Sequence, residues 1–127
     1  MQVNDTFTVE KVVTKELTAK TVGSGTAEVL ATPMMVALME NAAMQCIAPS
    51  LEEGQMSVGI LMQIDHTSAT PVGMKVQATA KVIEIDRRRV VFEVVAHDEC
   101  GVIGQGRHER MVVDEKKFLD RCYSKKA

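Results

Sequence analysis

The spacing of apolar residues changes once along this chain, from a helical pattern before Gly54 to alternation after it. Residues 32–48 are almost continuously apolar, which predicts a helix that is enclosed on all sides rather than half-solvated. Thr32 is a favoured N-cap residue, and Pro33 suits the first helical position because its missing N–H would be unpaired there. Pro49 and Gly54 end the run. The pattern therefore predicts one long buried helix.

The segments on both sides of this helix have the composition of strands. Before the helix, the pattern predicts a strand at residues 6–14, a polar loop at 15–25 and a short strand at 27–30. After it, the pattern predicts strands at residues 57–70, 75–85 and 90–97, then a hairpin turn at 98–101 and a long strand to about residue 113. The charged tail from residue 114 predicts a short helix or a frayed end.

Alternation also indicates which side chains face the helix. In the second strand after it, the inward residues are Val76, Ala78, Ala80 and Val82. In the first, one face holds Val58, Ile60, Met62 and Ile64, and His66 ends that face. In the last strand, Gly104 and Gly106 indicate a bulge or the close approach of another backbone.

A meander of antiparallel strands must cover its apolar face, and the single long helix is the only candidate for doing so. We therefore predict an α+β fold in which a curved antiparallel sheet wraps around one central helix. Residues 1–127 are predicted to form a single domain, with a core at about 6–113 and a C-terminal tail at 114–127.

Composition excludes several classes of function. The 127 residues are 46% apolar and 25% charged, which is ordinary for one globular domain. A net charge of −2 and an aromatic content of 3% argue against nucleic-acid binding and against an anionic membrane surface. No run approaches the ~20 apolar residues of a membrane span, and we expect no signal peptide. The 3 cysteines lack CxxC spacing, which indicates a reduced cytoplasmic location and no zinc site.

Glu40 is the residue that most directly suggests chemistry. Its neighbours three and four residues away on the helix are Val36, Ala37, Ala43 and Met44. A carboxylate in such an apolar stripe must be paired, protonated or catalytic, because burying an isolated charge is costly. The alternative, equally open, is that Glu40 reaches solvent beside Asn41 and Gln45.

His66 and Thr32 carry weaker indications. His66 lies on the face that the helix should cover, where it could be an acid, a base or a satisfied core residue. Capping explains Thr32 at ~1 kcal/mol, but a hydroxyl at a helix N-terminus could also stabilise a developing oxyanion. His97 and His108 have less support because each lies at or near a strand end. The arginines at 87–89 indicate a solvated turn or, alternatively, a phosphate site.

Two motifs in combination resemble a known family. They are residues 31–43 (ATPMMVALMENAA), followed by Val58-Gly59, and residues 66–73 (HTSATPVG). Over roughly residues 6–113 the chain resembles the fluoroacetyl-CoA thioesterase-like branch of the hot-dog acyl-CoA thioesterases.

This resemblance implies the hot-dog fold and a catalytic set of Thr32, Glu40 and His66. It implies that Gly59 lies near the thioester carbonyl and that Arg110 lies close to the site. It also implies a homodimer in which the sheets join edge to edge and each active site lies between subunits. No metal or cofactor is expected, since CoA is part of the substrate.

The predicted function is hydrolysis of short or medium acyl-CoA esters to the free acid and CoA. Glu40 would attack the carbonyl or activate water, and His66 would pass a proton to the departing thiolate. Thr32 would position Glu40 or hold the oxyanion. Two alternatives stay open: a hot-dog enoyl-CoA hydratase or dehydratase, and a non-catalytic acyl-CoA sensor.

Family members that are selective for fluoroacetyl-CoA carry aromatic residues in the lid before the helix. Residues 15–31 of this chain contain no aromatic residue, so fluoroacetyl selectivity is not predicted.

Overall fold

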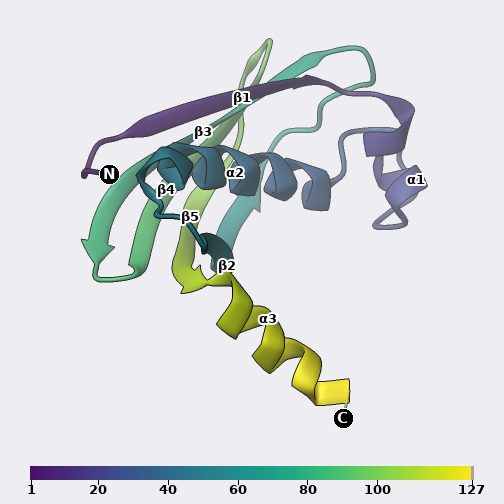
Figure 1. Ribbon diagram of the computed structural model, residues 1–127. Coiled ribbons are helices and arrows are strands. Elements are labelled where there is room, and N and C mark those ends of the chain that lie inside the picture. Colours follow the sequence, from purple (N-terminus) through teal and green to yellow (C-terminus); the bar gives the residue numbers. More distant parts are fainter. Residues whose placement is uncertain (127) are drawn as a thin grey trace.

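The computed structural model describes residues 1–126. Five antiparallel strands form one sheet in the order β1-β3-β4-β5-β2. They are β1 (Thr6–Val12), β2 (Gln55–His66), β3 (Lys75–Asp86), β4 (Arg89–Asp98) and β5 (Gly101–Asp114). The long helix α2 (Thr32–Ile47) crosses one face of the sheet, and the strands curve around it (Figure 1). The predicted single-domain α+β architecture is confirmed.

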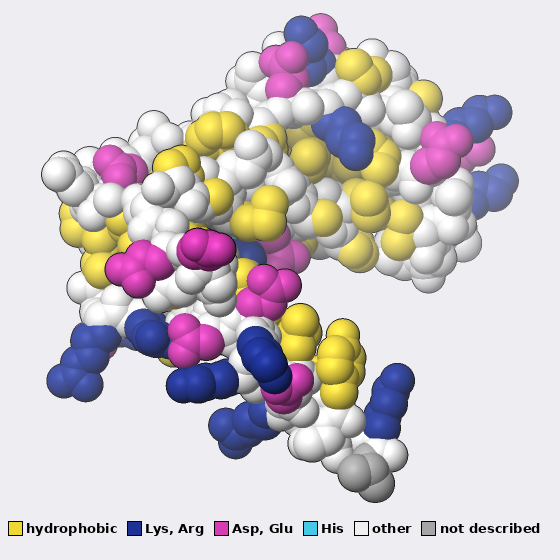
Figure 2. All heavy atoms as spheres, in the orientation of Figure 1, with side chains coloured by type: hydrophobic (Ala, Val, Ile, Leu, Met, Phe, Trp, Pro, Cys, Tyr) yellow, Lys and Arg dark blue, Asp and Glu magenta, His cyan; other side chains and the backbone are white. Residues whose placement is uncertain are grey.

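The remaining elements are short. They are the 3-10 helix η1 (Lys15–Leu17), α1 (Ala19–Val22), the 3-10 helix η2 (Ala48–Ser50), α3 (Glu115–Tyr123) and the 3-10 helix η3 (Ser124–Lys126). Of the two alternatives predicted for the C-terminal tail, a short helix or a frayed end, the helix is present as α3, and the last residue, Ala127, lies outside the described residues. Figure 2 shows apolar side chains on one side of α3, which projects away from the body of the molecule in Figure 1.

The segment before α2 differs from its prediction. The predicted loop at residues 15–25 contains η1 and α1, because the side chain of Thr18 caps α1 and Gly23 ends it with a φ of 89°. The short strand predicted at residues 27–30 is replaced by two isolated bridges, Thr18 to Leu30 and Val29 to Pro71. Four residues are too few for a local pattern to decide between a strand and a turn.

Helix α2 has the predicted extent but a different start and a different degree of burial. Its N-cap is Ala31, so Thr32 is the first helical residue and makes no side-chain cap. One side of α2 faces the sheet and is buried through Met35, Met39, Ala42, Ala43 and Ile47. The opposite side is open at Thr32, Pro33, Ala37, Asn41 and Met44. The prediction of a fully enclosed helix was wrong for this chain, because a single sheet covers only one side of a helix.

Strand β3 confirms the predicted alternation. Its inward residues are completely buried: Val76, Ala78, Ala80 and Val82. The hairpin turn predicted at residues 98–101 is also present, since β4 ends at Asp98 and β5 begins at Gly101. Local periodicity and turn chemistry were sufficient for this half of the sheet.

Strand β2 departs from regular alternation at a bulge. Its pairing with β5 shifts register between Gly59 and Leu61, so Ile60 is an extra residue with 49% of its surface exposed. The bulge exchanges the two faces of the strand upstream of it. On the face of β5 that carries Val112, Arg110, His108, Gly106 and Gly104, all buried except the half-buried Gly106, the opposing β2 residues are Ser57, Gly59, Met62, Ile64 and His66. The prediction that Val58 and Ile60 share the face of His66 was wrong, because one inserted residue reverses the alternation.

The two glycines of β5 lie where another backbone approaches closely, as predicted. A Cβ atom on Gly104 would lie 2.6 Å from the carbonyl oxygen of Asp65 and 2.7 Å from Cε of Met35. A Cβ atom on Gly106 would overlap the carbonyl oxygen of Gln63. These glycines allow β2 and α2 to pack tightly against β5.

None of the helices within residues 1–126 has the length and apolar character needed to cross a membrane.

Candidate active site

The first part of the candidate site joins the start of α2 to the end of β2. Thr32 Oγ1 lies 2.7 Å from His66 Nδ1. Because Thr32 is the first residue of α2, its hydroxyl stands beside the partial positive charge of the helix N-terminus. The other ring nitrogen, His66 Nε2, is buried and has no hydrogen-bond partner within the described chain. The pair therefore offers a hydroxyl and an imidazole in direct contact.

This pair borders a small cavity of about 330 Å³. Its other lining residues are Ala19, Ser24, Val29, Leu30, Thr67, Ser68 and Ala69. The lining comes from the segment before α2 and from the turn after β2. The sequence-predicted residues Thr32 and His66 are thus brought together on an accessible recess.

The second part of the site surrounds the carboxylate of Glu40. Glu40 is half-buried and stands over Gly59, where a Cβ atom would lie 2.8 Å from Glu40 Oε2. The same Cβ position lies 3.2 Å from His108 Cε1 and 3.6 Å from Arg110 Nη1. Glycine leaves a gap at this point that is shared by a carboxylate, an imidazole and a guanidinium. The bulge at Ile60 is what turns Gly59 toward them.

Arg110 is buried and is held by three hydrogen bonds. Its Nε donates to Ser57 Oγ at 2.9 Å, and its Nη2 donates to the Ser57 carbonyl at 3.0 Å. Its Nη1 lies 3.2 Å from His108 Nε2. Burial lowers the pKa of Arg110 and the Glu40 carboxylate opposes this, but a guanidinium stays charged at neutral pH. A fixed positive charge therefore faces Glu40.

His108 is a residue of this site that the sequence did not single out. It is 1% exposed, its Nδ1 lies 2.8 Å from the Leu61 carbonyl oxygen, and its ring stacks on Phe92. Burial lowers the pKa of His108, and its contact with Leu61 opposes that shift. Sequence reasoning placed His108 near a strand end, whereas it lies inside β5. The alternation of His108, Arg110 and Val112 on one face was the available indication.

The two parts of the site are well separated within one chain. Thr32 and Glu40 are eight residues apart on α2, which corresponds to about 12 Å along a helix axis. Gly59 and His66 are seven residues apart on β2, and because Ile60 is an extra, bulged residue, the separation is about 20 Å along the strand. Within one chain, the hydroxyl of Thr32 is hydrogen-bonded to His66 and is too far from Glu40 to contact it.

Three other residues that the sequence offered as candidates for a functional site do not take part in this one. Arg89 forms ion pairs with Glu84, Asp86 and Glu109, so its charge is already neutralised by carboxylates. Arg87 occupies the left-handed region with a φ of 59° in the turn between β3 and β4. His97 is exposed on β4. The phosphate alternative for residues 87–89 therefore gains no support.

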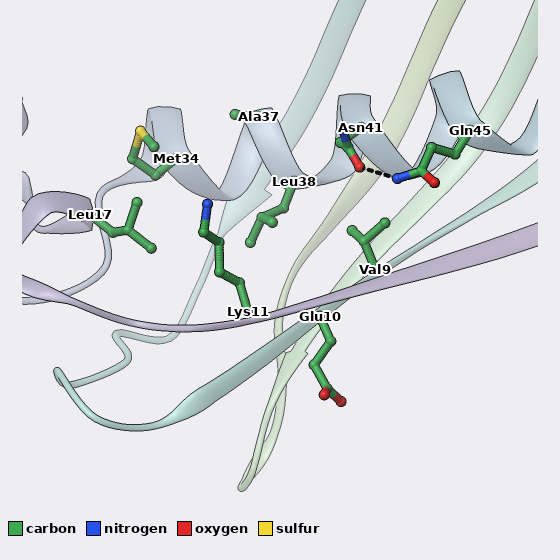
Figure 3. Close-up of a pocket in the computed structure, with 9 residues that line it drawn as sticks. All are labelled: Val9, Glu10, Lys11, Leu17, Met34, Ala37, Leu38, Asn41 and Gln45. Atoms are coloured by element: carbon green, nitrogen blue, oxygen red, sulfur yellow. Dashed lines mark hydrogen bonds between the residues drawn. The ribbon is translucent and has the colours of Figure 1, made fainter. Parts of the chain in front are cut away.

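A larger groove of about 550 Å³ lies between β1 and α2, and Figure 3 shows the side chains that line it. It is lined by Val9, Glu10, Lys11, Leu17, Met34, Ala37, Leu38, Asn41 and Gln45. None of the five predicted site residues is among them.

Within residues 1–126, no group of three His, Cys, Asp or Glu side chains is arranged to hold a metal ion, and all three cysteines are free.

Comparison with known proteins identifies the family. The sequence model of the fluoroacetyl-CoA-specific thioesterases matches residues 13–116. The chain is 45% identical to the fluoroacetyl-CoA thioesterase of Streptantibioticus cattleyicolor over 91 residues, which are 72% of this chain and 66% of that relative. The alignment therefore spans just under two thirds of that relative's length.

Solved structures agree with this assignment. A threonine-to-serine mutant of the fluoroacetyl-CoA thioesterase FlK, solved in complex with acetyl-CoA, superposes with a TM-score of 0.95. It is 36% identical, and the match covers 100% of both chains. A thioesterase superfamily member from Thermus thermophilus is 32% identical with a TM-score of 0.89, covering 98% of this chain and 94% of that one. The chain belongs to the fluoroacetyl-CoA-specific thioesterase family of hot-dog acyl-CoA thioesterases.

Proposed function

We propose that this protein hydrolyses short or medium acyl-CoA esters to the free acid and CoA, with Thr32, Glu40 and His66 as its catalytic residues. The observation that carries this proposal is the 2.7 Å contact between Thr32 Oγ1 and His66 Nδ1 at the N-terminus of α2. A hydroxyl paired with an imidazole beside a helix N-terminus suits acyl transfer, because negative charge develops on the carbonyl oxygen. The thioesterase activity of the relatives supports the same reaction.

The roles follow from the chemistry of each group. Glu40 attacks the thioester carbonyl or removes a proton from the attacking water. His66 delivers a proton to the departing CoA thiolate, and Thr32 orients His66 or donates to the oxyanion. Gly59 leaves space for the thioester beside Glu40, and Arg110 provides positive charge there. General acid–base help of this kind contributes about 10²- to 10⁴-fold in rate.

We also propose that each active site is assembled from two copies of the chain. Thr32 and Glu40 of one chain are about 12 Å apart along α2, too far for one thioester to contact both. Strand β2 carries Gly59 in its first half and His66 as its last residue, and it is an edge of the five-stranded sheet. Antiparallel pairing of β2 with β2 of a second copy would bring His66 of one chain close to Gly59 and Glu40 of the other. Open strand edges are commonly protected by such pairing.

An ester panel with free thiol as the readout tests the reaction. We expect CoA release from acetyl- to octanoyl-CoA without added metal or cofactor, and we expect EDTA to leave the rate unchanged. The same panel should include enoyl-CoA esters, monitored for loss of the conjugated double bond. Turnover of the double bond with no release of thiol would refute hydrolysis and indicate a hydratase. Binding without either reaction would indicate a sensor.

Mixing two inactive variants tests the shared site. Thr32→Val and Glu40→Gln each disable every site of their own homodimer. A mixed dimer has one site with both substitutions and one site with neither. Equal mixing with free subunit exchange should therefore restore about a quarter of wild-type activity. No recovery, with exchange verified by mass spectrometry, would show that the site does not combine Thr32 and Glu40 from different chains.

A further inference from the structure

We infer that His108 is a positioning residue of this site, whose neutral imidazole holds the guanidinium of Arg110 against the gap between Glu40 and Gly59. The inference rests on the proposed function, because it assigns Arg110 a part in thioester hydrolysis. His108 would contact no substrate and would act only through Arg110. Its role depends on which ring nitrogen carries the proton, and the contacts of the ring determine this.

One nitrogen of the His108 ring must be a donor. Nδ1 lies 2.8 Å from the carbonyl oxygen of Leu61, and a carbonyl oxygen only accepts. The proton of a neutral ring is therefore on Nδ1. This leaves a lone pair on Nε2, and Nη1 of Arg110 donates to it at 3.2 Å. An arginine has no acceptor, so a protonated Nε2 would face a donor with another donor.

The position of the imidazole is itself well determined. The ring is 1% exposed, and it stacks on Phe92 with the two centroids 5.9 Å apart and the planes at 26°. Leu61 lies directly after the bulge, where the register of β2 against β5 has shifted. The contact with Leu61 therefore ties the ring to the feature of β2 that turns Gly59 inward.

The hydrogen bond from Arg110 to His108 decides where the guanidinium points. Two nitrogens of Arg110 donate hydrogen bonds to Ser57: Nε to its hydroxyl oxygen and Nη2 to its carbonyl oxygen. Nη1 is the remaining nitrogen, and it is also the one that lies 3.6 Å from the Cβ position of Gly59. Without an acceptor at His108 Nε2, the guanidinium could tilt about its contacts with Ser57. Its charge would then move relative to Glu40.

Two amide substitutions distinguish the hydrogen bond made by Nδ1 of His108 from the one made by Nε2. In His108→Asn, the amide nitrogen can take the place of Nδ1 and donate to Leu61, but no acceptor remains for Arg110. In His108→Gln, the amide oxygen can take the place of Nε2 and accept from Arg110, while the donor to Leu61 is lost. A residue that only fills space beside Phe92 would respond similarly to both. A residue that holds Arg110 would respond mainly to asparagine.

The experiment measures kcat and KM for both variants and for Arg110→Met, alone and combined with His108→Asn. We expect His108→Asn to lower kcat/KM by about 10- to 100-fold, the range for losing one hydrogen bond to a charged group. His108→Gln should recover most of this loss. In the Arg110→Met background, His108→Asn should have no further effect, because the two residues act as a unit. His97→Asn, at an exposed histidine of β4, is the matched control.

The ¹⁵N resonances of the wild-type ring provide a readout that needs neither activity nor a variant of His108. We expect Nδ1 to be protonated and Nε2 unprotonated at pH 7, and we expect Arg110→Met to shift the Nε2 resonance. Equal losses in the Asn and Gln variants, multiplying losses in the double variant, or a protonated Nε2 would each overturn the inference. If the wild-type protein hydrolyses no ester, the proposed function fails, and the ring resonances still decide whether His108 holds Arg110.

Discussion

Thr32 and His66 are in direct contact through Oγ1 and Nδ1 at 2.7 Å, although 34 residues separate them in the chain. The contact connects the first residue of α2 with the last residue of β2. It also explains why Thr32 does not cap the helix. Ala31 occupies the N-cap position, and the hydroxyl of Thr32 is turned to the histidine instead of to a backbone N–H. The threonine is thus explained by its partner rather than by helix stability.

Removing only the hydroxyl of Thr32 should therefore affect activity more than stability. We expect Thr32→Val to lower kcat by about 10²-fold or more, in line with the loss of an oriented hydroxyl at a developing charge. Its melting temperature should change little, because Thr32 is exposed and makes no cap. Thr32→Ser keeps the hydroxyl and should retain most of the activity. A valine variant with normal turnover would remove Thr32 from the mechanism.

Glu40→Gln keeps the shape of the side chain but cannot act as a base or a nucleophile. We expect at least a ~100-fold loss of kcat, with stability unchanged or higher, since catalytic groups are often held at a cost in stability. His66→Asn should behave in the same way, and the double variant should lose little more than either single one. Glu93→Gln, an exposed glutamate of β4, serves as the control. An active and folded Glu40→Gln protein would contradict the mechanism.

Gly59→Ala should inactivate the enzyme without unfolding it. The added Cβ would lie 2.8 Å from Glu40 Oε2, and the end of a glutamate side chain can move aside. The carboxylate would then leave its position, so we expect a loss of kcat/KM with less than about 1.5 kcal/mol of lost stability. Gly25→Ala is the control, because its Cβ would meet only Ala19 at the ordinary distance of 3.4 Å. Unaltered activity in Gly59→Ala would show that the gap is not used.

Gly106→Ala should have the opposite profile. Its Cβ would overlap the carbonyl oxygen of Gln63, which belongs to the backbone of β2 and cannot rotate away. We expect the β2–β5 pairing to be disrupted at a cost of about 1–3 kcal/mol, measured by urea unfolding. Activity should fall in proportion to the folded fraction. A variant as stable as the wild type would mean that the two strands can separate at this point without loss.

The stability of the protein should depend on pH through His108. Burial holds the pKa of His108 below its ordinary value of 6.5 in the folded state, so the unfolded chain takes up this proton first as the pH falls. The contribution is present above pH 6.5 and is lost as the pH decreases through the window below it. We expect His108→Asn to reduce the drop in melting temperature between pH 7.5 and pH 5.5. An identical drop in both proteins would show that His108 titrates alike in the two states.

Much of the fold was readable from local sequence. The inward residues of β3, such as Val76 and Val82, followed from alternation, and the turn after Asp98 followed from its residue types. Helix α2 was recognisable because an almost continuous apolar run follows Pro33 and ends before Pro49. Each of these features depends on residues that are neighbours in the chain, so a local pattern contains the necessary information.

The geometry of the site was decided by tertiary structure. The sequence indicated Thr32, Glu40 and His66 as residue types, but the contact of Thr32 with His66 exists only because β2 returns to the start of α2. One inserted residue, Ile60, turned Gly59 toward Glu40, and alternation alone cannot reveal a bulge that is defined by pairing with β5. His108 and Arg110 share one face of β5 by alternation, but only the pairing of β5 with β2 brings that face to Gly59 and Glu40. The sequence thus determined which residues are candidates for the site. Strand register decided the face, the partner and the orientation of each side chain, and register depends on residues far apart in the chain.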